Sequence, residues 1–193
     1  APEEWIPLKS GDFFKEQNIE MKLGQRVTSI DAQAKRVALA DGSTLAYDRL
    51  LLATGSQPIR LPPDVARGHV FYLRTFGDSK RIIEAAEKAQ RAVVIGASFI
   101  GLEVAASLRA RGLEVHVVAP EARPLERVLG PQLGDLIRRL HEEEGVVFHL
   151  GRKPAAIEPE HVVLDDNTRL QADLVVMGVG PPPDATGGAR RPR

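Results

Sequence analysis

Residues 91–105 read RAVVIGASFIGLEVA, a short apolar strand that runs through a glycine turn into a helix. The pattern predicts a strand over Val93–Ile95, a helix over Ser98–Arg111 that ends at Gly112, and a second strand over Val115–Ala119. Because strands that alternate with helices pair in parallel, the segment predicts an α/β fold built on a parallel sheet.

The glycines of this segment have the spacing of a dinucleotide-binding turn. Gly96 directly follows the strand, where a side chain would hinder both the sharp turn and the approach of a pyrophosphate. Unpaired amides and the positive dipole end of the next helix favour phosphate there. Gly101 and Ala105 let the helix pack closely on the strands. Ser98 replaces the middle glycine of the pattern, which fits the motif if its hydroxyl caps the helix.

Selectivity between NAD and NADP depends on the residues after the second strand. A carboxylate at the strand end accepts hydrogen bonds from the ribose hydroxyls of NAD, but Ala119 stands there. Glu121 favours NAD if it turns toward the ribose, whereas Arg123 would hold the 2′-phosphate of NADP. Both residues are also compatible with a solvated loop. We expect NADH to be favoured.

Further strands and helices are predicted around this unit. Asp41-Gly42-Ser43 predicts a tight hairpin turn. The apolar run Leu50–Ala53 predicts a strand buried on both faces, as in a parallel sheet. The other expected strands cover residues 27–30, 37–40, 44–47 and 146–150, and the other expected helices cover residues 78–90 and 131–144.

An internal repeat relates the two halves of the chain. Residues 36–55 (RVALADGSTLAYDRLLLATG) align without gaps on residues 161–180 (HVVLDDNTRLQADLVVMGVG). Each copy predicts a hairpin that leads into a buried strand ending on glycine, which indicates two related halves. Two hairpins of one type can also converge on similar residues, because turn chemistry alone explains the pair Asp41/Asp166. Only the second half has a full βαβαβ unit before its hairpin, so we expect the beginning of the first half to be missing.

Composition excludes several classes of function. The 26 basic residues balance 26 acidic ones and only 5% of residues are aromatic, which argues against binding nucleic acid. The absence of cysteine excludes zinc-ribbon, iron–sulfur and catalytic-thiol sites within these residues, and the five histidines lack metal-ligand spacing, so no metal site is expected. With no signal peptide and no apolar stretch long enough to span a bilayer, we expect a cytoplasmic protein that does not contact membranes.

Three motifs in order, LLLATGSQP at residues 50–58, GASFIGLEVAASL from Gly96 and ADLVVMGVGPPPD at residues 172–184, resemble the FAD-dependent pyridine nucleotide–disulfide oxidoreductase superfamily. Within it they are similar to ferredoxin reductases of oxygenase systems and to apoptosis-inducing-factor-like reductases. The resemblance implies a Rossmann-like NAD(P)-binding domain over residues 78–180, with a parallel sheet and a β-hairpin meander. Residues 1–77 would be the β-rich rear portion of an FAD-binding domain, and residues 181–193 a linker or disordered tail.

The resemblance also implies roles for individual residues. Glu103 would approach the nicotinamide carboxamide and the flavin edge, as the candidate catalytic residue. Arg60 stands one place later than the family's usual arginine, near the FAD phosphates. The other implied contacts are Gly96, Ser98, Phe99, Ile100 and Gly101 around the NAD(P)H pyrophosphate, Val179 and Gly180 beside the nicotinamide, and Val27, Ala53, Thr54 and Gly55 around FAD.

The implied reaction is hydride transfer from NAD(P)H to FAD, followed by electron transfer to a ferredoxin or a Rieske-type protein. The family's first glycine-rich FAD fingerprint, its Gly-Asp motif for the ribityl phosphate and its interface domain have no counterpart in this sequence. We therefore expect a fragment in which FAD binding is weak or absent. The alternative is a non-catalytic domain that binds a nucleotide or a partner subunit. An uncovered strand edge in the first half would also permit a homodimer.

Overall fold

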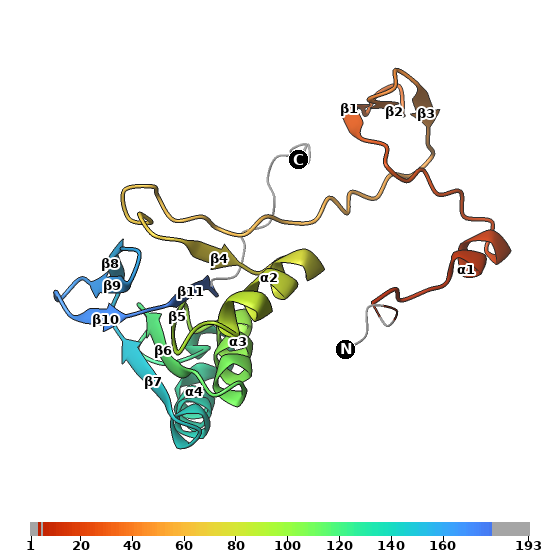
Figure 1. The fold of residues 1–193 in the computed structure, drawn as a ribbon. Coiled ribbons are helices and arrows are strands. Elements are labelled where there is room, and N and C mark those ends of the chain that lie inside the picture. The colour runs from red at the N-terminus through yellow and green to blue at the C-terminus, as the bar shows by residue number, and fades with distance from the viewer. Residues whose placement is uncertain (1–3, 5, 179–193) are drawn as a thin grey trace. The chain divides into compact units, whose positions relative to one another are not determined.

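The computed structural model describes residue 4 and residues 6–178, and it divides after Ala53 into two compact units (Figure 1). The smaller unit contains helix α1 (Gly11–Glu16) and an antiparallel sheet of three strands, in the order β1-β2-β3. These strands are β1 (Val27–Asp31), β2 (Arg36–Leu39) and β3 (Thr44–Ala46). The predicted hairpin turn is present, since the Ser43 N–H donates to Asp41 Oδ1 at 2.9 Å. Its strands lie close to the predicted ranges, whereas α1 has no counterpart among the predicted elements.

The prediction of a buried strand over Leu50–Ala53 is wrong. These residues form no strand, and 86% of the Leu51 surface is exposed. The repeat-related strand β11 (Leu174–Met177) pairs in parallel with a strand on each side and is buried along its whole length. An apolar run becomes a buried parallel strand only where such neighbours exist, and none pairs with residues 50–53 among the described residues.

The larger unit is built on a parallel sheet of five strands, in the order β4-β11-β5-β6-β7. Besides β11, these are β4 (Val70–Tyr72), β5 (Arg91–Ile95), β6 (Glu114–Ala119) and β7 (Val146–Leu150). The predicted α/β class and parallel pairing are therefore confirmed. Strand β4 is missing from the prediction because a three-residue strand is too short for a period to be recognised.

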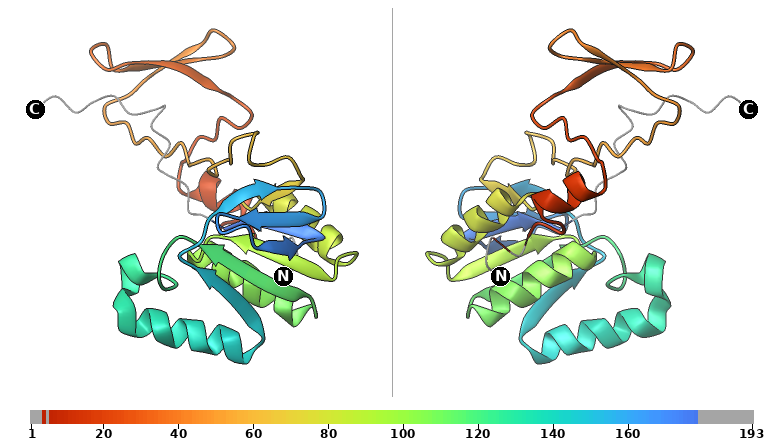
Figure 2. Two further views of the ribbon diagram at one scale, coloured as in Figure 1. Left: turned by 90° about the vertical axis from the view of Figure 1, so that its left-hand side faces the viewer. Right: turned by 90° about the vertical axis from the view of Figure 1, so that its right-hand side faces the viewer.

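Two apolar layers cover the opposite faces of this sheet (Figure 2). Alternate residues point to opposite sides, so that Val94 faces the helices and Val93 faces the antiparallel strands. The helices are α2 (Phe76–Ala86), α3 (Phe99–Ala110) and α4 (Glu126–Glu143). The antiparallel strands are β8 (Pro154–Ile157), β9 (His161–Leu164) and β10 (Arg169–Gln171), of which β8 has no counterpart among the predicted strands.

The starts of two helices differ from the predicted positions. Helix α2 begins at Phe76 because Thr75 and Asp78 form a reciprocal capping box. Helix α4 joins two helices across Gly130, whose φ of 76° is not helical. The predicted start at Pro131 is the start of the second of these, where proline lacks only an N–H that would be unpaired anyway.

Candidate nucleotide-binding site

The turn between β5 and α3 has the geometry that its glycines predict. Gly96 has a φ of 108°, which an L side chain rarely adopts, and its N–H donates to the Val118 carbonyl at 2.7 Å. Ser98 is the N-cap of α3, as the motif requires, and its hydroxyl oxygen accepts the Gly101 N–H at 3.4 Å. The same hydroxyl donates to the Gly178 carbonyl at the end of β11. Ser98 thus ties the start of α3 to the end of β11.

Two glycines let the first turn of α3 lie directly against the strands. A Cβ on Gly101 would overlap the Gly96 carbonyl oxygen and lie 3.3 Å from the Gly178 carbonyl oxygen. A Cβ on Gly178 would in turn overlap the Cα of Gly101 and lie 3.3 Å from a Val94 methyl group. Ala105, one turn further along the helix, is fully buried. This close packing fixes where the unpaired amides at the start of α3 point, which favours an anionic group there.

A cavity of about 390 Å³ opens beside this turn, next to the residues that follow β5 and β6. Nucleotides bind at this carboxyl edge in open α/β sheets. The lining combines the turn with residues from two other segments: Ile59, Gly96, Ala97, Ser98, Glu121, Leu125, Glu126, Arg127 and Val128. The structure therefore brings Gly96, Ser98 and Glu121 together around one space.

Glu121 and Arg123 have different surroundings. Glu121 lines the cavity and lies 3.7 Å from Arg127 Nη2. Arg123 is absent from that lining, and its guanidinium binds Asp135 at 2.8 Å and Glu126 at 3.1 Å. These carboxylates, Asp135 foremost, raise the pKa of Arg123 above its ordinary value. Sequence reasoning did not single out Arg127, because its nearness to Glu121 depends on how the loop turns into α4.

Other predicted residues on α3 lie outside the cavity lining. Phe99 is largely exposed, and Ile100 packs against the apolar layer under the helices. Glu103 is exposed and lines a separate cleft of about 250 Å³ between α2 and α3, together with Ser79 and Ser107. Val179 and Gly180 lie outside the described residues.

The residues expected around FAD are divided between the two units. Val27 is 51% exposed on β1 of the smaller unit, and Ala53 is exposed at the end of that unit. Thr54 and Gly55 are exposed at the start of the larger unit. The guanidinium of Arg60 lies over the Tyr72 ring, 4.8 Å from its centroid.

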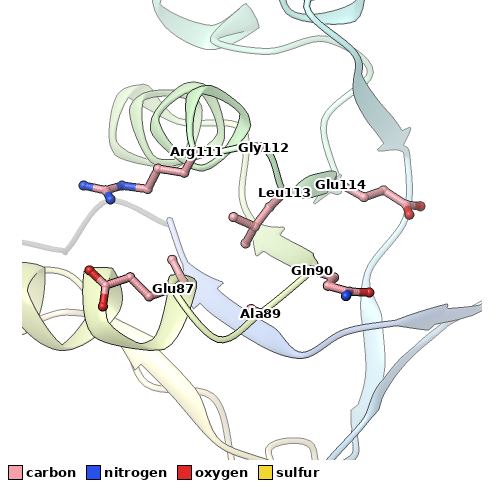
Figure 3. A pocket seen from close by; sticks show the side chains of 8 residues that line it. Glu87, Ala89, Gln90, Arg111, Gly112, Leu113 and Glu114 are labelled. Atoms are coloured by element: carbon pink, nitrogen blue, oxygen red, sulfur yellow. The ribbon is translucent and has the colours of Figure 1, made fainter.

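A wider cleft of about 610 Å³ lies at the opposite edge of the sheet, where α2 and α3 end and β5 and β6 begin (Figure 3). Figure 3 shows Glu87 and Arg111 extending to one side and Gln90 and Glu114 to the other, with Leu113 between them. A ligand site needs a few polar groups that converge on one point. Those of this cleft diverge, so the cavity beside Gly96 is the better candidate despite its smaller volume.

The structure also joins two histidines that are far apart in the sequence. His116 Nδ1 lies 2.9 Å from His149 Nε2, and His116 Nε2 lies 2.9 Å from Glu114 Oε1. Burial, and then the charge of His116, lower the pKa of His149 below its ordinary value. No group of three or more His, Cys, Asp or Glu residues that could hold a metal ion occurs within the described part of the chain. Its helices also include none that is long and apolar enough to cross a membrane.

Comparison with known proteins gives consistent matches. The chain is 38% identical over 178 residues to the ferredoxin–NAD(+) reductase component of the anthranilate 1,2-dioxygenase system of Burkholderia cepacia, covering 90% of this chain and 44% of the relative. It is 39% identical over 193 residues to putidaredoxin reductase of Pseudomonas putida, covering 93% and 45%. The crystal structure of a covalent putidaredoxin reductase–putidaredoxin complex matches with a TM-score of 0.84 and 35% identity, covering 96% of this chain and 47% of that one.

The chain spans about half the length of the curated relatives it matches. The family model for pyridine nucleotide-disulphide oxidoreductases matches residues 6–190, which is nearly the whole chain. The glycine turn, the Ser98 cap and the cavity at the carboxyl edge of the sheet agree with that match. The chain belongs to the pyridine nucleotide-disulphide oxidoreductase family.

Proposed function

We propose that this chain is the NAD(P)H-binding part of a flavoprotein reductase. The observation that carries the proposal is the turn Gly96–Gly101, which places the N-terminus of α3 beside a cavity at the carboxyl edge of a parallel sheet. The names of the relatives, a ferredoxin–NAD(+) reductase component and a putidaredoxin reductase, support the same function.

Each part of the cavity has a role in holding the nucleotide. Gly96 leaves room for the pyrophosphate, and the amides at the start of α3, at Phe99 and Ile100, bind its oxygens. Glu121 accepts hydrogen bonds from the adenosine ribose. Because Asp135 and Glu126 engage Arg123, Glu121 is the better placed of the two to determine selectivity, and NADH is favoured. The contacts proposed for Val179 and Gly180 beside the nicotinamide fall outside the described residues.

FAD supplies an acceptor for the nicotinamide hydride and a donor of single electrons. Glu103 would orient the nicotinamide carboxamide, and Val27, Ala53, Thr54 and Gly55 would contact FAD through their backbone. Arg60 would contact a phosphate of FAD only if its guanidinium moved away from the Tyr72 ring. The exposure of Val27 and of residues 53–55 supports the proposal that this chain binds FAD weakly.

The electron acceptor that we propose for the whole enzyme is a small iron–sulfur protein of the ferredoxin or Rieske type. The solved complex between putidaredoxin reductase and putidaredoxin supports this class of partner. The chain is proposed to act in the cytoplasm.

A titration of the purified chain with NADH and with NADPH tests the nucleotide claim. Quenching of protein fluorescence or a calorimetric signal is expected below millimolar concentration, with NADH the tighter ligand. ADP should displace NADH, because it carries the adenosine and pyrophosphate that the cavity beside Gly96 holds. If neither nucleotide binds at millimolar concentration, the proposal fails.

The second candidate function is a non-catalytic domain that binds a nucleotide or a partner subunit. The exposure of Leu51 and its neighbours favours this second function, because an exposed apolar run can bind a strand of a partner chain. The two functions differ in colour and activity. A yellow preparation that oxidises NADH with an artificial electron acceptor would support the reductase. A chain that binds NADH but stays inactive when FAD is added in excess would support the second function. Light scattering would show separately whether two copies form a homodimer.

A further inference from the structure

The nucleotide cavity is also lined by the segment that leads into the larger unit. Residues 54–61 form a connector that contains Thr54 and Gly55, which are proposed to contact FAD, and Ile59, which lines the cavity beside Gly96. We propose that Ile59 closes over the bound nucleotide, and that through this contact NAD(P)H binding fixes the connector. This inference rests on the nucleotide-binding function proposed above.

Both ends of the connector lie beside the carboxyl end of β4. The Leu61 N–H donates to Tyr72 Oη at 3.2 Å, and Leu61 packs into the apolar layer between the sheet and the antiparallel strands. At the other end Gly55 has a φ of 78°, and a Cβ on it would lie 3.3 Å from Arg74 Nη2. Tyr72 is the last residue of β4, and Arg74 follows two residues later. The connector therefore begins and ends against the end of one strand.

The middle of the connector is held less firmly than its ends. Residues 56–59 belong to no helix or strand, and they form no hydrogen bond within the described part of the chain. The Ile59 side chain is 41% exposed although it lines the cavity. Segments with few contacts move at little cost in free energy. The middle of the connector can therefore close on a ligand without breaking an existing hydrogen bond.

Two physical effects favour closure by Ile59. An apolar side chain that covers the nucleotide loses surface to water, and it keeps water from the amides at the start of α3, which strengthens their attraction for the pyrophosphate. Pro58 also fixes one of its own backbone dihedral angles and restricts Gln57 to extended conformations. Because these two residues are already stiff, ordering them costs less conformational entropy, and a restraint at Ile59 extends towards Gly55.

Fixing the connector links the two cofactor sites. Ile59 lies at the nucleotide cavity, whereas Thr54 and Gly55 are the proposed FAD contacts on the same short segment. A nucleotide that restrains Ile59 therefore also restrains the backbone at Thr54 and Gly55. Ile59 is thus a positioning residue, which holds the flavin side of the site in place when the hydride donor is bound. A coupling of this kind between two binding events acts equally in both directions.

Thiol labelling of the full chain tests the closure, because the chain contains no cysteine and each variant then has a single thiol. Gln57→Cys places that thiol on the exposed middle of the connector. Saturating 5′-ADP should slow its alkylation by N-ethylmaleimide about fivefold, since a thiol in a closed segment is less accessible. In Gln57→Cys/Ile59→Ala the same nucleotide should leave the rate unchanged. Gln132→Cys, on an exposed α4 glutamine outside the cavity, is the matched control for labelling.

Calorimetric titration with 5′-ADP tests the contact itself. Ile59→Ala should weaken binding about threefold to fivefold, because less apolar surface is covered. Ile19→Ala is the matched control, since Ile19 is a similarly exposed isoleucine of the smaller unit, and it should leave the affinity unchanged. Both variants truncate exposed side chains, so the fold should be retained.

The outcomes separate the inference from the function on which it rests. An alkylation rate of Gln57→Cys that 5′-ADP leaves unchanged would overturn the inference. An equal slowing in the double variant would show that the connector closes without Ile59, and an equal slowing in Gln132→Cys would show a general stabilisation of the chain; either result would also overturn it. An unchanged affinity in Ile59→Ala would overturn the contact. If 5′-ADP fails to bind the unchanged chain, the proposed function fails and the inference with it.

Discussion

At the scale of single residues, the site depends on glycines that tolerate no side chain. Gly101 packs against the Gly96 carbonyl on one side and against Gly178 on the other. The atoms that a Cβ would meet belong to the backbone, so they cannot rotate away as a flexible side chain would. The positions of the glycines are therefore set by how closely the backbone of α3 approaches the backbone of the neighbouring strands.

Gly101→Val should destabilise the chain and abolish nucleotide binding. We expect a loss of at least about 2 kcal/mol in the free energy of unfolding, because the added side chain forces α3 away from β5 and β11. Urea unfolding followed by circular dichroism measures it. Gly77→Ala is the matched control, since a Cβ there meets only ordinary contacts at 3.7 Å and 3.9 Å, and it should be neutral or stabilising. A stable Gly101→Val chain that binds NADH would contradict the close packing.

Asp173 provides a second residue-scale prediction. Its carboxylate accepts the N–H groups of Gln90 and Arg91 at 3.0 Å and 2.9 Å and pairs with the Arg91 guanidinium. Asp173→Asn should lower the free energy of unfolding by about 1 to 2 kcal/mol, because charge-assisted hydrogen bonds are lost. The repeat provides the control, since Asp48 is the aligned residue and Asp48→Asn should change stability by less than about 0.5 kcal/mol. Equal effects of the two variants would contradict this prediction.

The Asp173 carboxylate also makes the free energy of unfolding depend on pH in the acid range. Hydrogen bonds from Arg91 hold the pKa of Asp173 below its ordinary value of 3.8. A carboxyl with a lowered pKa in the folded state stabilises the fold above its ordinary pKa, and that contribution is lost as the pH falls through the folded pKa. The difference in stability between the unchanged chain and Asp173→Asn should therefore shrink below about pH 4. Unfolding midpoints measured between pH 6 and pH 3 check this.

At the scale of secondary-structure elements, β6 and β7 are joined by side chains as well as by their ladder. His116 and His149 lie in contact on the face that the antiparallel strands cover, with Glu114 on one side of the pair and Asp166 close enough to act on it. Burial of His149, and then the charge of His116, oppose protonation of His149. The stability of the sheet at β6 and β7 should therefore depend on pH through this histidine pair.

This coupling predicts a loss of stability in mild acid. Because the pKa of His149 is lower in the folded chain than its ordinary value of 6.5, the unfolded chain binds the extra proton first as pH falls. The free energy of unfolding should decrease from pH 7.5 to pH 5.5, and His149→Gln should reduce that decrease. His161→Gln, on strand β9 of the antiparallel sheet, should leave that decrease in place. An identical pH profile for His149→Gln and the unchanged chain would refute the prediction.

At the scale of the whole molecule, the apolar core is distributed unevenly. Both clusters of buried residues belong to the larger unit, whereas the described part of the smaller unit buries only Val37 and Leu39 among its large apolar side chains. Burial of apolar surface is the main source of stability, so the larger unit is by far the more stable one. Residues 50–53, beside the boundary, have no ladder to protect them.

Limited proteolysis should therefore cut the chain near this boundary first. Trypsin is expected to cleave after Arg49, which is exposed, and to leave a fragment that keeps its fold and binds 5′-ADP. Arg109 is the internal comparison, because its guanidinium donates to the Leu113 and Glu144 carbonyls and its cleavage should require unfolding. Cleavage after Arg109 as early as after Arg49 would contradict this picture, and so would loss of nucleotide binding on cleavage at Arg49.

The sequence by itself determined strand β5, the glycine turn that follows it, the Ser98 cap of α3 and the hairpin of β9 and β10. Each of these depends on backbone freedom, capping or turn chemistry within about twenty residues, and such effects act wherever the segment is placed. The parallel pairing of β5 and β6 could also be predicted from the sequence. Two strands joined by a single helix usually pair in parallel through a right-handed crossover.

Only the tertiary structure decided the rest. Whether an apolar run becomes a strand depends on its neighbours, so the aligned runs at residues 50–53 and 174–177 differ. The contact of His116 with His149 joins residues 33 positions apart, and that of Gln90 with Asp173 joins residues 83 positions apart. The engagement of Arg123 by Asp135, which leaves Arg127 beside Glu121, depends in the same way on the path of α4. Long-range packing sets these distances, and no local pattern encodes them.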